Sequence, residues 1–552
     1  MTLRPATKFE LAQQIRTGQH IPDILDCLAQ LSNDEVPTPP KVARRMLDVL
    51  PSEVWDKPDY VWLDPFCKSG IFLREAAARL LEGLSDQIPN FEKRRDHIYR
   101  KMLWGTSITK MTGIISRRSL YYSRDASGPE SVARFDAEAG NLPFIAVSHQ
   151  WDRDDKCGTC RAPRAIERGG RENYAYSFIH GAYPTKEMST TMRPDVIVGN
   201  PPYQIGIENE RDSPDANPVY QYFVERAIEM NPRHVVMIVK SGWFTGGKAQ
   251  LDGFRTRMIA DRRLAKIVDN PKLFDCFPGV EIKGGVNYFL WSRDHDGDCE
   301  FSTRVGGVIT STEVRDLREG EGVLVRDNNA ASIIRKVAVA RAERGTLEEK
   351  VAPRYPFGPT LMSNFKGAKD APFEGAIPLI FGSKVGYIRP EQITRNIDWV
   401  DKWKVLIPKA SDGHGRPVSY VLGEPIALAP GSACTQTYLV AGTFDSRTET
   451  ENYANYLVTK FVRFLVLQRK VTQDVTPDRF RFVPALDMSR QWTDEDLYNE
   501  FELTDEERTY VDSVIQPRAI NLSLDSPIPA SHLSGGTQFG TNGAVTAVEA
   551  DE

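Results

Sequence analysis

The sequence predicts an α/β protein with a doubly wound, Rossmann-like sheet, followed by a smaller carboxyl-terminal domain of mixed α+β type. Strand-like and helix-like segments alternate between residues 31 and 300, which is the pattern of βαβ units and a parallel sheet. Beyond residue 350 the chain is richer in Gly, Pro and short strand-like runs. The chain has 552 residues, 41% of them hydrophobic and 26% charged, so it is long enough for two or more hydrophobic cores.

The alternating pattern follows a helical segment expected over residues 1–30 and a proline-rich loop, SNDEVPTPP. A strand, a loop of small residues and a helix are predicted in YVWLDPFCKSGIFLREAAARLLEGL, and a second strand and helix in KMLWGTSITKMTGIISRRSLYY. Further strands are expected in PDVIVGNPPYQ, HVVMIVKSGWF and AKIVDNP, and a last hairpin ends at GGVNYFLWSR. We therefore expect one domain over residues 31–300.

The carboxyl-terminal half predicts a different organisation. Residues 301–350 hold a short β segment and a charged helix, and we expect them to be a connector. Residues 351–516 predict a second domain, with one clear helix in NYANYLVTKFVRFLVLQRK and a last helix that has Thr504 as its N-cap. Residues 517–552 are rich in Ser, Gly, Thr and Ala, which is typical of a disordered tail.

The composition sets limits on the class of protein. No apolar run is long enough to span a bilayer, and MTLRPATKFE lacks the apolar core of a secretory signal, so we expect a cytoplasmic protein without a membrane partner. Seven thinly spread cysteines do not make a disulfide framework, and we expect thiols or metal ligands.

A net charge of −5 argues against a protein that coats nucleic acid through bulk positive charge, so a nucleic-acid surface would have to be local. Three basic segments are candidates, although any one such segment is more often a solvated helix face. They contain Lys93, Arg94, Arg95, Arg100 and Lys101; Arg255, Arg257, Arg262, Arg263 and Lys266; and Lys460, Arg463, Arg469 and Lys470.

The stretch VIVGNPPYQ, residues 196–204, predicts a strand that stops abruptly in a stiff loop. The β-branched run suits a strand buried on both faces. Pro201 and Pro202 then bar continuation, and Asn200 is pushed into an extended conformation because it precedes a proline. Unpaired carbonyl groups at the carboxyl end of a parallel strand are typical of a ligand site, although a proline-rich exit loop explains the same residues.

LDPFCKSGIF, residues 63–72, has the same general placement at the end of the first strand. Asp64, a turn of small residues and Gly70 precede a helix, which is the arrangement of a nucleotide-like cofactor site: a bare backbone and a carboxylate. A tight strand-to-helix turn with an exposed Asp is the structural alternative.

Taken together, VPTPPKVARRML, LDPFCKSGIF and VIVGNPPYQ resemble the S-adenosylmethionine-dependent N6-adenine DNA methyltransferases. Their order, with a target-recognition domain at the carboxyl end, is similar to the γ class of restriction–modification methyltransferases. The resemblance covers residues 31–300 well. It implies methylation of adenine N6 in a specific sequence of double-stranded DNA, with a cognate restriction endonuclease or other defence-system subunits as partners.

The resemblance also implies roles for individual residues of the catalytic loop. In this family the target adenine is flipped from the duplex, and the Asn amide oxygen and the first Pro carbonyl accept hydrogen bonds from its N6 amino group. Asn200 and Pro201 match these positions. Pro202 stiffens the loop, Tyr203 offers a face for stacking on the base, and Phe277 matches an aromatic residue on the opposite side of the adenine.

The cofactor residues follow from the same resemblance. Those implied to contact S-adenosylmethionine are Thr38, Pro39, Asp64, Phe66, Gly70, Asn141 and Phe144, the last two in GNLPF, which resembles the loop after the third strand. Two positions depart from the family pattern. Lys68 stands where Gly is usual, and WGTSIT lacks the acidic residue that binds the ribose, for which Thr106 or Ser107 is a substitute.

An insertion at 145–185 contains Cys157 and Cys160 in a C-x-x-C pair, flanked by His149 and His180. These residue types predict a tetrahedral zinc site, and free thiols with core histidines are the alternative.

A second motif, DCFPGVEIK, spaces Asp275, Glu281 and Lys283 like the core of a metal-dependent nuclease. We favour a loop and strand of the methyltransferase hairpin, because GGVNYFLW continues directly as a buried strand.

Two other functions are compatible with these motifs. One is methylation of an amino group in RNA or in a protein amide, since the same loop serves such enzymes. The other is a DNA-binding specificity subunit with an impaired cofactor site, which Lys68 leaves open. The long region 351–500 favours duplex recognition, because a small free substrate would not require it.

Overall fold

The computed structural model divides the chain into two compact units, residues 1–326 and 327–552. It describes residues 37–107, 109–164, 176–185, 193–205, 217–246, 249–272, 275–277, 284–382, 384–411, 421–470 and 473–518. The expected helical segment at 1–30 and nearly all of the expected tail lie outside these ranges. Within them no helix is both long enough and apolar enough to cross a membrane.

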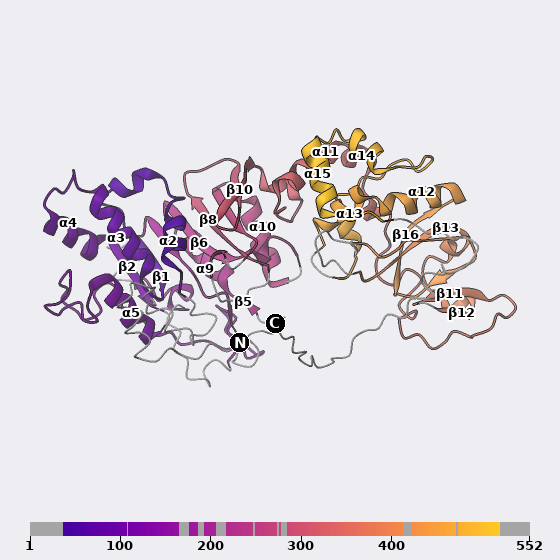
Figure 1. Cartoon of the computed structure of the whole chain (residues 1–552). Helices are drawn as coiled ribbons and strands as arrows, with labels where there is room; N and C mark the ends of the chain where they lie inside the picture. The colour runs from indigo at the N-terminus through magenta and orange to yellow at the C-terminus, as the bar shows by residue number, and fades with distance from the viewer. Residues whose placement is uncertain are drawn as a thin grey trace, which may run out of the picture. The chain divides into compact units, whose positions relative to one another are not determined.

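The first unit is built on one sheet of eight strands, in the order β10-β9-β7-β8-β6-β3-β1-β2 (Figure 1). Four neighbours, β2, β1, β3 and β6, run parallel, and β8 pairs antiparallel with both β6 and β7. The strands are β1 (Trp62–Cys67), β2 (Leu103–Ser107), β3 (Val196–Gly199), β6 (His234–Lys240), β7 (Leu264–Asn270), β8 (Val286–Ser292), β9 (Cys299–Val305) and β10 (Val308–Arg315).

The central strands form because they are near-continuous apolar runs. Every residue of β1 and β3 is buried, as are five of the seven residues of β6. Such runs fit strands that are covered on both faces by helices. The α/β fold class and the strands expected in the first domain are therefore confirmed.

Helices cover this sheet and connect its parallel strands. α3 packs on α2 and α5 and contacts β1, while α9 packs on β6 and α7. The helices are α2 (Pro40–Leu47), α3 (Ile71–Gly83), α4 (Phe91–His97), α5 (Lys110–Tyr121), α7 (Tyr176–Ile179), α9 (Tyr220–Glu229) and α10 (Asp252–Ala260), with a short β4 (Gln204–Ile205) and β5 (Asn217–Pro218) pair beside them.

Two expectations about the first unit were wrong. Residues 301–350 are not a connector, because β9 and β10 complete the first sheet and the boundary between the units falls at residue 326. In addition, no strand lies between α5 and Asn141 among the described residues, so GNLPF does not follow a third strand. Turns occupy this segment, held by bonds such as Ala126 N–H to Glu138 O.

The second unit combines two three-stranded sheets with helices. This arrangement agrees with the predicted mixed α+β type. The helix expected at NYANYLVTKFVRFLVLQRK is two helices, because Thr459 leaves the helical region and caps the second one. Thr504 caps the last helix, as expected. The elements are α11 (Asn328–Arg344), β11 (Ile377–Phe381), β12 (Lys384–Ile388), β13 (Trp403–Pro408), β14 (Ile426–Leu428), β15 (Ala433–Cys434), β16 (Tyr438–Phe444), α12 (Arg447–Val458), α13 (Lys460–Leu467), α14 (Asp494–Glu500) and α15 (Asp505–Val514).

The pairing of β1 with β3 brings the two motif loops together. Trp62 lies opposite Val196 and Leu63 opposite Ile197, so both parallel strands end at the same edge of the sheet. Gly199 permits the close approach, since a Cβ atom there would lie 2.5 Å from Phe66 Cδ2 and 3.1 Å from Asp64 Oδ1. The sheet therefore places LDPFCKSG beside GNPPY.

We expect Gly199→Ala to lower the free energy of unfolding of the first unit by about 1–3 kcal/mol, since overpacking a fixed core ring forces the backbone to shift. Urea unfolding measures the change. Gly242→Ala is the matched control, because a Cβ atom there meets no atom within 4 Å. Equal stability of the two variants would contradict the close packing of Gly199 on Phe66.

Candidate active site

Asn200 sits directly after β3 and is only 4% exposed. Its Nδ2 donates a hydrogen bond of 3.1 Å to Thr38 Oγ1, which comes from the loop before α2. Its Oδ1 is buried and has no hydrogen-bond partner among the described residues. A buried acceptor without a partner costs roughly 1–3 kcal/mol of folding free energy. A ligand that donates a hydrogen bond to this oxygen would therefore be bound favourably.

A small open-sided hollow lies at this edge of the sheet, with a volume of about 190 Å³ that includes open solvent. It is lined by Thr38, Asp64, Phe66, Lys68, Ser69, Gly70, Ile71, Phe72 and Asn200, which come from the three predicted motifs. The hollow therefore marks the place where the three motifs meet.

Gly70 closes the turn between β1 and α3. Its φ of 70° lies in the left-handed region, and a Cβ atom there would stand 3.0 Å from Ser116 O in α5. Only glycine meets both requirements without strain. The turn leaves Gly70 and the first residues of α3 on the wall of the hollow, where the helix N-terminus favours negative charge.

Asp64 is the buried carboxylate of this site, with 2% of its surface exposed. Burial raises its pKa to about 7, against opposing contributions from the Phe66 N–H, the Cys67 side chain and the positive charge of Lys68. The Phe66 N–H donates to Asp64 Oδ1 at 3.0 Å. Asp64 is therefore poised to ionise near neutral pH, and a cation bound beside it would favour the ionised form.

Phe66 lines the hollow. Two aromatic rings that the sequence analysis did not single out pack against it. Phe178 of α7 and Phe223 of α9 meet it edge-on, with ring centroids 5.8 and 5.0 Å away. Both are apolar residues in helical segments, but their spacing alone did not indicate which ring they contact.

Pro201, Pro202 and Tyr203 are buried in the same loop. The Tyr203 hydroxyl has no partner among the described residues, and burial raises its pKa well above the usual value. Lys240 Nζ lies 5.9 Å from the Tyr203 ring centroid and donates to Gln204 Oε1 at 2.8 Å. The stacking role of Tyr203 stays a prediction.

Phe277 is also buried, with 2% of its surface exposed, and belongs to the core of the first unit. Its neighbour Cys276 is close enough to Tyr203 to influence the phenol electrostatically, so the DCF segment adjoins the catalytic loop. Of the nuclease-like residues, Asp275 accepts from the Gly306 N–H at 2.7 Å, and Glu281 and Lys283 lie outside the described ranges.

The geometry of Asn141 differs from the cofactor contact that the resemblance implied. Its Nδ2 donates to the carbonyl oxygens of Tyr99, Arg100 and Leu103 at 2.9–3.2 Å, which anchors its loop to the start of β2. The described geometry thus favours an anchor, because the amide N–H groups are already used. Phe144 packs under the Arg117 guanidinium at 4.9 Å.

The two substitutes for the missing ribose-binding acid differ in their bonding. Thr106 is buried, and its Oγ1 donates to Pro143 O at 3.0 Å. Ser107 is buried at the carboxyl end of β2, and its Oγ lacks a partner among the described residues. Of the two hydroxyl groups, that of Ser107 is therefore the one without a partner in the described structure.

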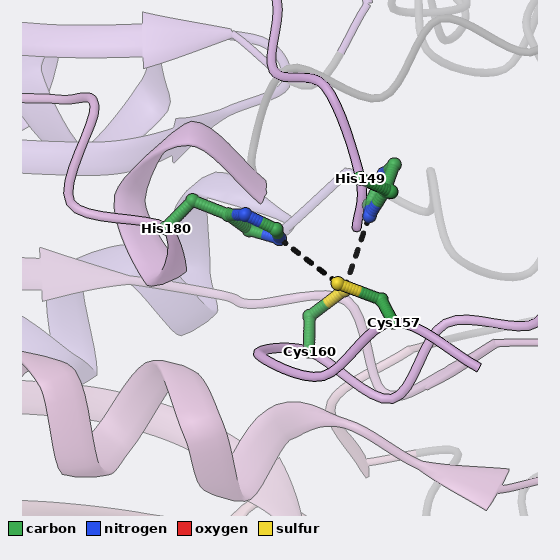
Figure 2. A group of neighbouring side chains, drawn as sticks. All are labelled: His149, Cys157, Cys160 and His180. Atoms are coloured by element: carbon green, nitrogen blue, oxygen red, sulfur yellow. Dashed lines mark hydrogen bonds between the residues drawn. The ribbon is translucent and has the colours of Figure 1, made fainter. Parts of the chain in front are cut away.

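The four side chains of the predicted metal set come together in the insertion. Figure 2 shows Cys157 and Cys160 facing His180 and His149, and the four ligand atoms lie within 4.8 Å of one another. Burial raises the pKa of Cys160 to about 12 and lowers that of His180. The structure thus assembles residues that are up to 31 positions apart in the chain.

The basic segments are largely paired within the protein. In the segment 460–470, Arg463 is buried and donates to backbone carbonyls, and Lys470 donates to Ser411 and Val421 O. In the segment 255–266, Arg257 pairs with Glu225 and Lys266 with Glu300. We find no basis in these contacts for a broad nucleic-acid surface at either segment.

We expect Phe277→Ala to cost about 3–5 kcal/mol of unfolding free energy in the DNA-free protein, because truncation of a core ring loses contacts and leaves a cavity. Phe91→Ala, at a ring that is 55% exposed, is the control and should change stability little. Unchanged stability together with weakened methyl transfer would place Phe277 on the substrate instead.

The chain matches the family model described as Eco57I restriction-modification methylase over residues 101–277. An uncharacterised adenine-specific methylase of Mycoplasma pneumoniae is 34% identical over 353 residues, which are 60% of this chain and 84% of that protein.

Among solved structures, the type IIG restriction endonuclease BpuSI is 12% identical over 90% of this chain and 65% of its own, with a TM-score of 0.39. A DrdV–DNA complex is 13% identical over 81% and 55%, also at 0.39. The chain thus spans less than two thirds of either solved chain. The identity to the Mycoplasma protein and the share of it that is covered show that the chain belongs to the family of adenine-specific methylases.

Proposed function

We propose that this methylase transfers a methyl group from S-adenosylmethionine to N6 of an adenine flipped out of duplex DNA, within a restriction–modification or related defence system. The observation that carries the proposal is the buried, unpartnered Oδ1 of Asn200. An exocyclic amino group supplies the donor that this acceptor lacks, and no tautomeric change of the base is required.

Methyl transfer to an amino group requires a hydrogen-bond acceptor for that group more than it requires a general base. When bound, S-adenosylmethionine supplies an electrophilic methyl group on a cationic sulfur. Asn200 Oδ1 and the Pro201 carbonyl would accept hydrogen bonds from the two N6–H groups, which would turn the nitrogen lone pair toward that methyl group. Once methylated, the nitrogen would release its extra proton to solvent. Thr38 fixes which way the Asn200 amide faces.

The residues that line the hollow suit the methionine end of the cofactor. Asp64 provides a carboxylate beside the expected cations, and the first turn of α3 favours the cofactor carboxylate. Lys68 lines the same hollow, and its positive charge favours ionised Asp64. Lys68 therefore supports Asp64 electrostatically, although it also takes up space where the family usually has Gly.

Duplex DNA is the proposed substrate, and the second unit the proposed target-recognition domain. Two small sheets, together with the long segment 345–376 between α11 and β11, give this unit surfaces that can vary independently of the sheet carrying the chemistry. A partner endonuclease stays a prediction from the sequence.

The first test is Asn200→Ala. We expect the rate of methyl transfer to fall on the order of 10²–10³-fold, because one hydrogen bond aimed at the reacting group is lost, while cofactor affinity changes little. The assay follows labelled methyl transfer from S-adenosylmethionine to unmethylated genomic DNA, and equilibrium dialysis gives the cofactor affinity.

Thr38→Ser is the matched control, since it keeps the hydroxyl group that holds Asn200, and it should retain most activity. Near wild-type turnover in Asn200→Ala would reject the mechanism. Label transferred to RNA or to protein, and not to DNA, would reject the substrate.

The second test uses the pH dependence of cofactor binding. Asp64 has a raised pKa of about 7 in the free protein. A cationic ligand binds better to the ionised carboxylate, so affinity should be full above pH 7 and fall as the pH drops through 7. The dissociation constant should rise by up to about tenfold per pH unit below that point.

Asp64→Asn should bind the cofactor more weakly and lose this pH dependence, whereas Asp59→Asn, at an exposed turn before β1, should keep it. A dissociation constant that is flat from pH 8 to pH 6 in the wild-type protein contradicts the role of Asp64. Undetectable binding at any pH would indicate the impaired specificity subunit.

A further inference from the structure

Two distances between the residues in Figure 2 match those of a tetrahedral metal site. Cys157 Sγ lies 3.7 Å from His180 Nε2, and Cys160 Sγ lies 3.4 Å from His149 Nδ1. With Zn–S of about 2.3 Å and Zn–N of about 2.0–2.1 Å, tetrahedral angles place S and N about 3.6 Å apart. The four ligand atoms as a set lie within 4.8 Å of one another, so a zinc ion would draw them closer together.

The backbone around the two cysteines is folded as a tight knuckle. The Cys157 N–H donates to Ala162 O at 2.8 Å, and the Arg161 N–H donates back to Cys157 O at 2.9 Å. Arg161 has φ of 58°, in the left-handed region, which turns the chain sharply after Cys160.

The histidines are oriented by their own surroundings. His149 stacks on Trp151 with the ring centroids 5.0 Å apart, and it meets His180 edge-on at 5.1 Å. His180 follows α7, whose Ser177 carbonyl accepts the Ala182 and Tyr183 N–H groups. Both rings are thus held in place by local packing and not only by the cysteines.

We propose that His149, Cys157, Cys160 and His180 bind one structural zinc ion that ties the first part of the insertion to the segment following α7. Two thiolates and two imidazoles in a tetrahedron are the donor set that zinc prefers. All four coordination positions are filled by the protein, so no position is open for water or substrate. The ion contributes folding free energy rather than chemistry.

Residues in and after α7 connect the proposed zinc site to the proposed cofactor hollow. Phe178 lies two residues before His180 and packs edge-on against Phe66, which lines the hollow. Three residues after His180, the Tyr183 hydroxyl donates to Gly105 O in β2 at 2.9 Å. Loss of the ion should therefore loosen the wall that positions Phe66, a consequence that rests on the proposed cofactor site.

The direct experiment is metal analysis of the full-length protein purified without chelators. We expect about one zinc ion per chain in the wild-type protein and almost none in Cys157→Ser or His180→Ala, with a lower melting temperature in both variants. Cys299→Ser, at a buried thiol in β9, and His295→Ala, at a half-buried histidine, are matched controls that should keep the metal.

A second measurement does not depend on whether the variants fold. Titration of the wild-type thiols with an organomercurial should release one equivalent of zinc, which a metal-sensitive dye detects. Cobalt substitution should give the strong visible absorption of a tetrahedral ion with thiolate ligands. Wild-type protein without zinc that also fails to take it up, or a Cys157–Cys160 disulfide found by mass spectrometry, overturns the proposal.

Cofactor binding separates this proposal from the proposed activity. Zinc present in stoichiometric amount, with no binding of S-adenosylmethionine, would support the metal site and reject the methyltransferase site. If both hold, removal of zinc should weaken cofactor affinity several-fold in the wild-type protein and leave the affinity of Phe178→Ala almost unchanged, since that variant already lacks the contact with Phe66.

Discussion

The site depends on one constraint, the point at which β3 ends. This strand is buried on both faces, and the residue that follows it, Asn200, carries a buried side-chain oxygen without a hydrogen-bond donor among the described residues. β3 is fully buried, and two prolines after Asn200 prevent the backbone from continuing the sheet. Thr38 occupies the amide nitrogen of Asn200, so Oδ1 is left without a donor in the described structure. Parallel pairing with β1 brings the buried carboxylate of Asp64 to the same edge. A buried hydrogen-bond acceptor and a buried carboxyl group are thereby fixed at one edge by the sheet itself.

Much of this could be predicted from local sequence because the relevant signals are local. The apolar runs of β1 and β3 identify buried parallel strands, and the residues after each run identify the two loops. The C-x-x-C pair with two histidines indicates a metal-binding set, which the fold brings together. In each case the residue type restricts the backbone conformation or the chemistry so strongly that tertiary packing does not change the local prediction.

The sequence could not show contacts between distant parts of the chain. Asn141 bonds to carbonyl groups 38–42 residues earlier, and no local pattern predicts such bonds. Residues 301–315 were expected to begin a connector, yet they extend the first sheet, since edge strands with exposed residues carry little apolar signal. Basic residues such as Arg463 were candidates for DNA contact, but burial and backbone acceptors use them inside the second unit.

The central claim is that Asn200 directs methylation to adenine N6 in DNA. Single-molecule sequencing of genomic DNA from a methylation-free host tests it most directly, with the host expressing either the wild-type chain or Asn200→Ala. We expect N6-methyladenine at one sequence motif in cells with the wild-type chain and none above background in cells with the variant. Genomic DNA without N6-methyladenine in both strains, or with the same methylated motif in both, would contradict it.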